Sequence, residues 1–259
     1  MFMGLVGSEM CIRDSNSFVV IIPSRLASTR LPRKSLADID GKSLIRRVYE
    51  RAIQSAASKV YIATDSNEIF DHIKIFSSDV VMTSKNHLSG TDRIQETAEI
   101  LSLEPNETII NLQGDEPFVP IELINGLADT FSNSDCDVAT VVTRCDEDDL
   151  SNPNTVKAAL SNKNKALYFS RSVIPNNFTQ KNQNYYRHIG IYAYKKATLD
   201  RLINLPTSAL EKAEKLEQLR FIENGFTIQA SIYDAEIPPG VDTLKDLELA
   251  INFIKNVSN

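Results

Sequence analysis

Positively charged side chains are concentrated in one short segment near the N-terminus. Residues 23–34 read PSRLASTRLPRK, in a chain whose formal net charge is −6. The cations of this segment are Arg25, Arg30, Arg33 and Lys34. With the hydroxyl groups of Ser28 and Thr29, they would let the segment wrap around a polyphosphate. The segment is not a P-loop, because the GxxxxGK[ST] pattern is missing, and the alternative interpretation is a solvated basic turn.

The elements that must position this basic loop follow an α/β pattern. From residue 18 onwards, apolar runs of strand length alternate with helical patterns, which is typical of βαβ units and a mostly parallel sheet. In the first half we expect strands at residues 18–22, 59–64, 79–82 and 108–113. Ligands of open α/β sheets bind beyond the carboxyl ends of the strands. Arg25, Asp65 and Asp115 each follow such a strand, so we expect all three at one edge of the sheet.

The second half is predicted to add strands and a smaller inserted lobe. The expected strands are residues 137–143, 155–160, 166–170, 188–194 and 226–233, and the expected helices of the chain are residues 43–57, 208–224 and 242–257. A capping box, Ser208 with Glu211, would open the second of these helices. The stretch 176–184 is rich in Asn and Gln, and we interpret it as a surface excursion of a lobe within about residues 145–195.

The chain is predicted to form one domain over residues 17–259. Residues 1–16 show neither helical or strand periodicity nor the charge and apolar pattern of a secretory signal. We expect them to be a non-native or wrongly assigned leader that is disordered and lies outside the fold.

Composition and charge argue against several functional classes. A negative net charge gives no general attraction to nucleic acid or to an anionic membrane, and the apolar runs are far shorter than the roughly 20 residues of a transmembrane helix. The three Cys and three His show no disulfide or zinc-ligand spacing, which favours a reduced cytosolic compartment. A nicotinamide cofactor is not expected, because GxGxxG does not occur.

Seven sequence blocks, taken in order, resemble one enzyme family. They are FVVIIPSRLASTRLPRKSL at 18–36, HLSGTDR at 87–93, NLQGDEP at 111–117, LYFSRS at 167–172, RHIGIY at 187–192, LEQLR at 216–220 and GVDT at 240–243. On these blocks, residues 18–255 resemble the sugar-activating nucleotidyltransferases, most closely the 3-deoxy-manno-octulosonate cytidylyltransferases. The resemblance implies a Rossmann-like nucleotidyltransferase fold, with the small inserted lobe forming a homodimer interface.

The resemblance also implies an activity. It is the Mg²⁺-dependent transfer of CMP from CTP to the anomeric hydroxyl of 3-deoxy-D-manno-octulosonate (Kdo), giving CMP-Kdo and pyrophosphate for lipopolysaccharide biosynthesis in the cytoplasm. CTP and the sugar acid would be the partners of the chain, without nucleic acid or a membrane. The alternatives are the 8-amino form of the same sugar, another CMP-sugar-acid synthetase such as a sialic acid cytidylyltransferase, or an inactive ligand-binding relative used as a dimer module.

Individual residues acquire roles from the same resemblance. Asp115 and Asp242 would ligate Mg²⁺, which typically takes one or two protein carboxylates with phosphate and water oxygens. The catalytic residues would be Lys34, Arg25 and Asp115. The nucleotide-binding residues would be Arg25, Ser28, Lys34, Ser89, Gly90, Arg93 and Gln113. The sugar-binding residues would be Arg171, His188, Tyr192, Glu217 and Gln218, of which the arginine fork suits a carboxylate.

Three of these residues also have structural interpretations. Asp115 could be a turn or helix-cap residue, and Asp242 could be the N-cap of the final helix. His188 could be a core or interface histidine that is satisfied by a backbone carbonyl. For each of them the sequence leaves both interpretations open.

The first basic loop departs from the family pattern at two positions. The family usually reads LPGKPL where this chain has LPRKSL, so Arg33 replaces a glycine and Ser35 replaces a proline. If the glycine position requires a positive φ, Arg33 would cost on the order of 1 kcal/mol and could move Lys34.

Overall fold

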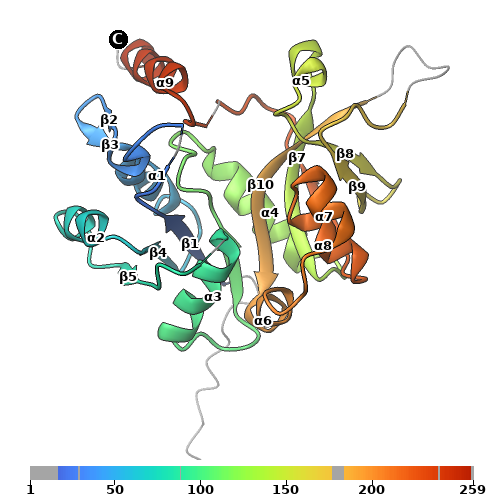
Figure 1. The fold of residues 1–259 in the computed structure, drawn as a ribbon, viewed down its shortest axis with the longest axis horizontal. Helices are drawn as coiled ribbons and strands as arrows, with labels where there is room; N and C mark the ends of the chain where they lie inside the picture. The colour runs from blue at the N-terminus through green and yellow to red at the C-terminus, as the bar shows by residue number, and fades with distance from the viewer. Residues whose placement is uncertain (1–16, 29, 88, 177–183, 239, 258–259) are drawn as a thin grey trace, which may run out of the picture.

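The computed structural model describes residues 17–28, 30–87, 89–176, 184–238 and 240–257 (Figure 1). The expected leader, residues 1–16, lies outside these ranges, as do Thr29 of the basic loop and most of the polar stretch 176–184. Within the described part of the chain, no helix is both long and apolar enough to cross a membrane.

A mixed, mostly parallel sheet forms the centre of the molecule. Its strands along the main path are β11 (Ile228–Ile232), β7 (Val138–Arg144), β10 (Tyr186–Lys195), β6 (Thr108–Asn111), β1 (Phe18–Ser24), β4 (Lys59–Thr64) and β5 (Val80–Met82), in that spatial order. β1 pairs in parallel with β4 and β6, β4 with β5, and β7 with β11. β10 runs antiparallel between β6 and β7. The predicted α/β fold with a mostly parallel sheet is therefore confirmed.

Helices cover both faces of β1, as its unbroken apolar sequence predicts. Val20 and Ile22 pack into one apolar cluster, and Val19 and Ile21 pack into another on the opposite face, because successive side chains of a strand alternate. The helices of the first cluster are α1 (Leu44–Ala52), α2 (Asn67–Lys74) and α4 (Ile121–Ser132), and those of the second are α3 (Gly90–Ile100), α6 (Lys196–Leu202) and α8 (Gln218–Glu223).

The remaining elements are short or peripheral. They are the 3-10 turn η1 (Lys34–Leu36), β2 (Asp38–Ile39), β3 (Lys42–Ser43), α5 (Glu147–Ser151), β8 (Lys157–Leu160), β9 (Ala166–Ser170), α7 (Ala209–Glu214) and α9 (Leu244–Val257). α9 packs over β2 and the start of α1 through a small apolar cluster that contains Ile39, Leu44 and Ala250. This packing brings the chain just before α9 close to the basic loop.

The prediction of one continuous helix over residues 208–224 is wrong. The capping box of Ser208 and Glu211 opens α7 as expected, but α7 ends at Glu214, and the next residue, Lys215, has φ 55° and ψ 48°. α8 then begins at Gln218. A left-handed residue interrupts helical geometry, and a lysine in the sequence gives no signal of that conformation. The expected helix 43–57 is also shorter, because α1 ends at Ala52.

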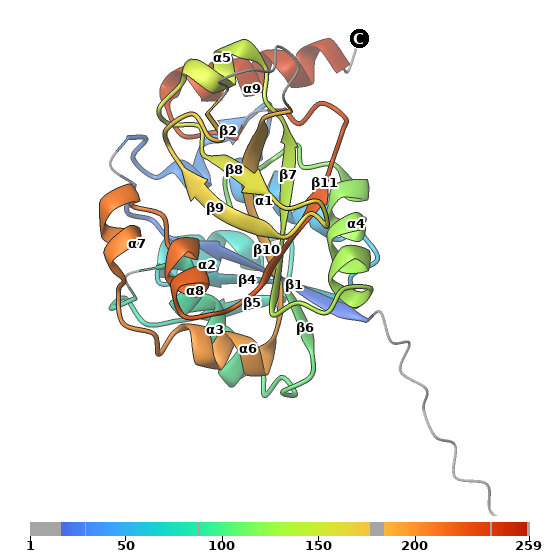
Figure 2. The same cartoon turned by 90° about the vertical axis from the view of Figure 1, so that its right-hand side faces the viewer.

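The segment predicted as a smaller lobe, residues 145–195, contains α5, β8, β9 and β10. β8 and β9 form an antiparallel hairpin that joins the central sheet through β10 (Figure 2). β10 itself lies inside the main sheet, so the segment is continuous with the core rather than attached by a linker.

Candidate active site

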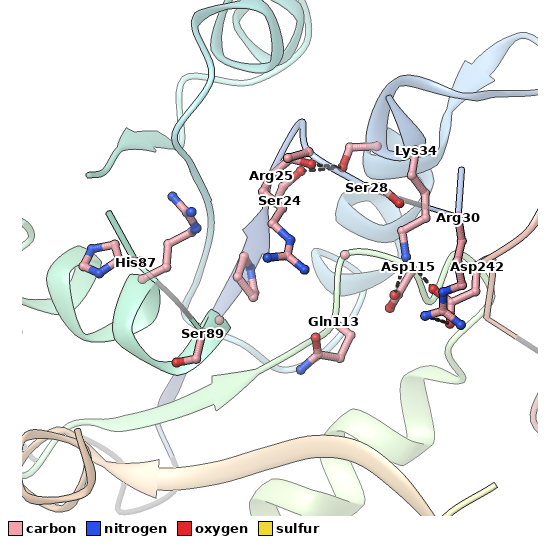
Figure 3. A pocket seen from close by; sticks show the side chains of 16 residues that line it. Ser24, Arg25, Ser28, Arg30, Lys34, His87, Ser89, Gln113, Asp115 and Asp242 are labelled. Carbon is pink, nitrogen blue, oxygen red and sulfur yellow. Dashed lines mark hydrogen bonds and ion pairs between the residues drawn. The ribbon is translucent and has the colours of Figure 1, made fainter. Parts of the chain in front are cut away.

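A cavity of about 390 Å³ lies beyond the carboxyl ends of β1 and β6 (Figure 3). Its walls come from the basic loop after β1, the start of α3, the loop after β6 and the chain before α9. The predicted nucleotide, catalytic and metal residues that line it are Arg25, Ser28, Lys34, Ser89, Gly90, Arg93, Gln113, Asp115 and Asp242. The fold thus brings together residues that are far apart in the sequence, since Lys34 and Asp242 are separated by 208 positions.

Lys34 joins the two predicted metal-ligating carboxylates. Its ammonium nitrogen Nζ donates to Asp115 Oδ2 at 2.7 Å and to Asp242 Oδ1 at 2.8 Å, and Figure 3 shows it between them. The second oxygen of Asp242 pairs with Arg30 at 2.9 Å. Burial alone would lower the pKa of the Lys34 ammonium, but the charges and hydrogen bonds of Asp115 and Asp242 outweigh burial and raise it.

The structure decides against Asp242 as a helix cap. Thr243 precedes α9, and its hydroxyl accepts a hydrogen bond from the Asp246 backbone N–H, while Asp246 Oδ2 accepts from the Thr243 N–H at 2.8 Å. These two bonds cap the helix reciprocally. The Asp242 carboxylate is therefore left to face the cavity and its cations.

Arg33 lies outside the cavity, although the sequence groups it with the other cations. It has φ 57° and ψ 31°, so the position does require the left-handed conformation that the family glycine adopts easily. Its guanidinium pairs with Glu68 of α2. Lys34 nevertheless reaches the carboxylates, so the replacement does not remove it from the site.

Ser35 replaces the family proline and holds the basic loop to β1. Ser24 Oγ at the end of β1 donates to Ser35 Oγ at 2.9 Å. The Ser35 hydroxyl in turn donates to the Arg25 carbonyl oxygen at 3.4 Å. Two hydroxyls thus fix the path of the chain on which Arg25 is carried.

Two residues predicted to bind the nucleotide are largely occupied by internal hydrogen bonds. Arg93 is 3% exposed, and its guanidinium pairs with Asp65 Oδ2 at 2.7 Å and donates to Thr83. Ser89 caps α3, since its Oγ accepts from the Asp92 N–H. Asp65 directly follows Thr64 of β4, which pairs with Ser24 of β1, so it lies at the predicted edge of the sheet, but it contacts Arg93 and does not line the cavity. Arg93 and Ser89 hold the wall of the cavity in place.

Gln113 has one half of its side-chain amide fixed. Nε2 donates to the Gly190 carbonyl oxygen of β10 at 3.0 Å and to Asn111 Oδ1 at 3.3 Å. The amide oxygen is then the group that can accept from a donor such as the exocyclic amine of cytosine. The bond to Gly190 also ties the nucleotide cavity to the strand that carries His188 and Tyr192.

His188 and Gln218, both predicted to bind the sugar, contact each other. His188 Nε2 lies 2.9 Å from Thr140 Oγ1, whose hydroxyl donates to the Ile191 carbonyl oxygen at 2.8 Å. This chain assigns the Nε2–H tautomer, so that Nδ1 accepts from Gln218 Nε2 at 3.5 Å. Burial lowers the pKa of His188 to about 3, and the imidazole is a neutral group near pH 7.

Tyr192 and Glu217 complete the same group of residues. The rings of His188 and Tyr192 are 5.5 Å apart. The Glu217 carboxylate accepts from Thr91 Oγ1 at 2.8 Å and from Arg220 Nη2 at 2.9 Å. Burial raises the pKa of Glu217, although the bond from Thr91 and the charge of Arg220 oppose the increase.

Arg171 is held by the backbone around the end of α7. Its Nε donates to the Glu214 carbonyl oxygen at 3.1 Å, and its backbone N–H donates to the Glu214 carboxylate at the same distance. Within the described part of the chain, Arg171 forms no hydrogen bond or ion pair with the other four predicted sugar residues.

Sequence reasoning missed two titratable residues of the cavity and its surroundings. His87 lines the cavity and its Nε2 lies 2.6 Å from Glu96 Oε2. Burial and the charges of Asp115 and Asp242 raise the pKa of Glu116 to about 8. Both residues fall within the matching blocks HLSGTDR and NLQGDEP, which is the signal that could have identified them.

The sequence and the structure of the chain are similar to those of known cytidylyltransferases. A family model described as cytidylyltransferase matches residues 19–231. The chain belongs to this cytidylyltransferase family.

Individual relatives narrow the assignment. The 3-deoxy-manno-octulosonate cytidylyltransferase of Alcanivorax borkumensis is 46% identical over 90% of this chain and 96% of its own length. That of Parabacteroides distasonis is 44% identical over 92% and 98%. A solved structure of CMP:2-keto-3-deoxy-manno-octonic acid synthetase complexed with CTP superposes with a TM-score of 0.88, at 37% identity over 93% of this chain and 99% of that one. Within the family, the chain is thus a member of the 3-deoxy-manno-octulosonate cytidylyltransferases, and the resemblance seen in the sequence is confirmed.

Proposed function

We propose that the chain transfers CMP from CTP to the anomeric hydroxyl of Kdo and releases pyrophosphate. The observation that carries the proposal is the Lys34 ammonium between Asp115 and Asp242 in a cavity that also contains Arg25 and Arg30. Such a mixture of cations and carboxylates suits a triphosphate with a divalent cation. The names of the relatives and the CTP-complexed structure supply the nucleotide and the sugar.

Asp115 and Asp242 fit a Mg²⁺ site. Both carboxylates contact one ammonium nitrogen, so their oxygens are close enough to share a cation. Within the described residues no group of three or more His, Cys, Asp or Glu could hold a metal by itself. Mg²⁺ does not need such a group, because it commonly takes one or two carboxylates together with phosphate and water oxygens. When bound, Mg²⁺ would neutralise phosphate charge and favour ionisation of the attacking hydroxyl.

The protein's own residues would position the two reactants. Arg25, Ser28 and Lys34 bind the phosphates, and Gln113 receives the base. The anomeric oxygen of Kdo forms a bond to the α-phosphorus as the bond to the bridging oxygen breaks. Pyrophosphate leaves with that oxygen, and the hydroxyl proton is released. Most of the catalysis comes from alignment and charge neutralisation, as is general for phosphoryl transfer.

We further infer that the enzyme works as a cytoplasmic homodimer in lipopolysaccharide biosynthesis. Exposed apolar side chains on and after β9 support an interface there, because Leu167 is 58% exposed and Val173 is 46% exposed. Burying such groups in a second copy would stabilise the pair. Light scattering coupled to size-exclusion chromatography would give the oligomeric state. We expect Leu167→Glu to shift a wild-type dimer to a monomer, and a wild-type monomer would contradict the proposal.

Pyrophosphate release tests the reaction directly. The four nucleoside triphosphates are each tested with and without Kdo, in Mg²⁺ and in EDTA. We expect release only with CTP, Kdo and Mg²⁺ together. Folded protein that releases pyrophosphate with no combination would overturn the proposal, and if it still binds CTP it would be an inactive ligand-binding relative.

The same assay separates the sugar substrates. Kdo, 8-amino-3,8-dideoxy-manno-octulosonate and N-acetylneuraminate are compared by kcat/KM at saturating CTP. We expect Kdo to have the highest value, because the matched relatives are Kdo enzymes. A preference for either other sugar acid would keep the transferase reaction and change its substrate.

A further inference from the structure

Thr91 lies between the nucleotide cavity and the predicted sugar-binding residues. It is the second residue of α3 and directly follows Gly90, which lines the cavity. The side chain of Thr91 does not line the cavity; its Oγ1 donates to Glu217 Oε2 at 2.8 Å. The two residues are 126 positions apart, and Thr91 is only 7% exposed.

This hydrogen bond fixes one half of the Glu217 carboxylate. Oε1 accepts from Arg220 Nη2 at 2.9 Å, three residues further along the chain. That bond is local to the start of α8, so it can move with α8. The bond from Thr91 is different, because it comes from another helix on the cavity wall. Each carboxylate oxygen retains lone pairs for further donors, such as the hydroxyls of a sugar.

We infer that Thr91 is a positioning residue that orients Glu217 toward the sugar acid and holds it in register with the nucleotide cavity. The inference rests on the proposed function and deepens it. Thr91 contacts neither reactant directly in this role. Its hydroxyl sets the angle of a carboxylate that does, and its backbone belongs to the first turn of the helix that begins at Gly90.

Substitution of Thr91 by valine removes the donor and keeps the shape of the side chain. A hydrogen bond to a charged group contributes enough that its loss should raise KM for Kdo roughly ten- to a hundred-fold. KM for CTP should stay unchanged. Thr91→Ser keeps the hydroxyl and should restore KM for Kdo. The matched control is Thr97→Val, because Thr97 is a fully buried threonine of the same helix whose hydroxyl donates to the Arg93 carbonyl oxygen.

A double-mutant cycle distinguishes positioning from general damage. In a Glu217→Ala background, Thr91→Val should have almost no further effect on KM for Kdo, since its target is gone. Additive effects would overturn the inference, as would an unchanged KM for Kdo in Thr91→Val. If Thr91→Val does not fold, as judged by thermal unfolding, Thr91→Cys and Thr91→Ser are compared instead. Wild-type protein that fails to use CTP and Kdo at all would refute the proposed function and not this contact.

Discussion

A side chain at Gly114 would collide with the backbone of Pro23. A Cβ atom built on Gly114 lies 2.8 Å from the Pro23 carbonyl oxygen, closer than real Cβ contacts allow. The contact joins the end of β1 to the loop after β6, so it sets the spacing between the basic loop and Asp115. Close approach of two backbone segments therefore requires glycine at this position.

We predict that Gly114→Ala lowers both stability and activity. The added methyl group must push the two segments apart, at a cost of about 1–3 kcal/mol in the free energy of unfolding. kcat/KM for CTP should fall because Asp115 moves away from Lys34. Gly126→Ala in α4 is the control, since nothing lies within 4 Å of its added Cβ. In this control, alanine should stabilise the helix by about 1 kcal/mol. The free energy of unfolding of both variants is measured in urea, and an equal decrease in the two would contradict the prediction.

Lys34 is expected to contribute mainly to turnover. Its side chain is 17% exposed and contacts both candidate metal ligands. Lys34→Met should lower kcat about 10²–10³-fold, as the loss of one preorganised charge at a transition state commonly does. Lys42→Met removes a lysine that pairs with Glu50 instead and should leave kcat unchanged. Equal kcat in wild type and Lys34→Met would exclude Lys34 from the reaction.

Arg33 should be replaceable by glycine without loss of stability. Its left-handed backbone carries a steric cost of about 1–2 kcal/mol. The exposed ion pair with Glu68 stabilises the folded protein by at most about 1 kcal/mol. Arg33→Gly should therefore leave the free energy of unfolding equal or higher, and Glu68→Gln should change it little. A clear loss of stability in Arg33→Gly alone would show that the ion pair holds the loop.

His188 predicts a dependence of stability on pH. Its pKa is about 3 in the folded protein and about 6.5 when unfolded, so the unfolded state binds the proton first as the pH falls. Stability from this residue is complete above about pH 6.5 and decreases toward pH 3, which amounts to about 2 kcal/mol between pH 7 and pH 5. His188→Asn should remove that part of the dependence. Parallel curves of unfolding free energy against pH for wild type and variant would show that His188 is not the group responsible.

The strands were predictable to within a few residues because their apolar runs are long and end at recognisable turns. Residues 59–64 and 166–170 match β4 and β9 in full. The antiparallel direction of β10 was not predictable, since its residue pattern is the same in either direction and only its partners decide. Lys215 interrupts the predicted helix 208–224 with a left-handed conformation, which a lysine in the sequence does not signal.

In the candidate site, too, some features were predictable from the sequence and others depend on tertiary contacts. Arg25, Lys34, Asp115 and Asp242, which the family blocks single out, all line the cavity. What a side chain does within the cavity can also depend on neighbours that lie outside the blocks. Arg93 turns to Asp65, and only the folded chain shows this. The roles assigned to these residues remain predictions until the variants are measured.

The position of β10 also has a consequence for folding while the chain is being synthesised on the ribosome. β6 and β7 are not neighbours in the sheet, and each pairs with β10, which is made later than both. Until residues 186–195 leave the ribosome, β6 exposes an unpaired edge and β7 has no link to β1. Because unpaired edges favour aggregation, we expect nascent chains that stall before residue 186 to depend on chaperones, whereas chains stalled after β11 should not.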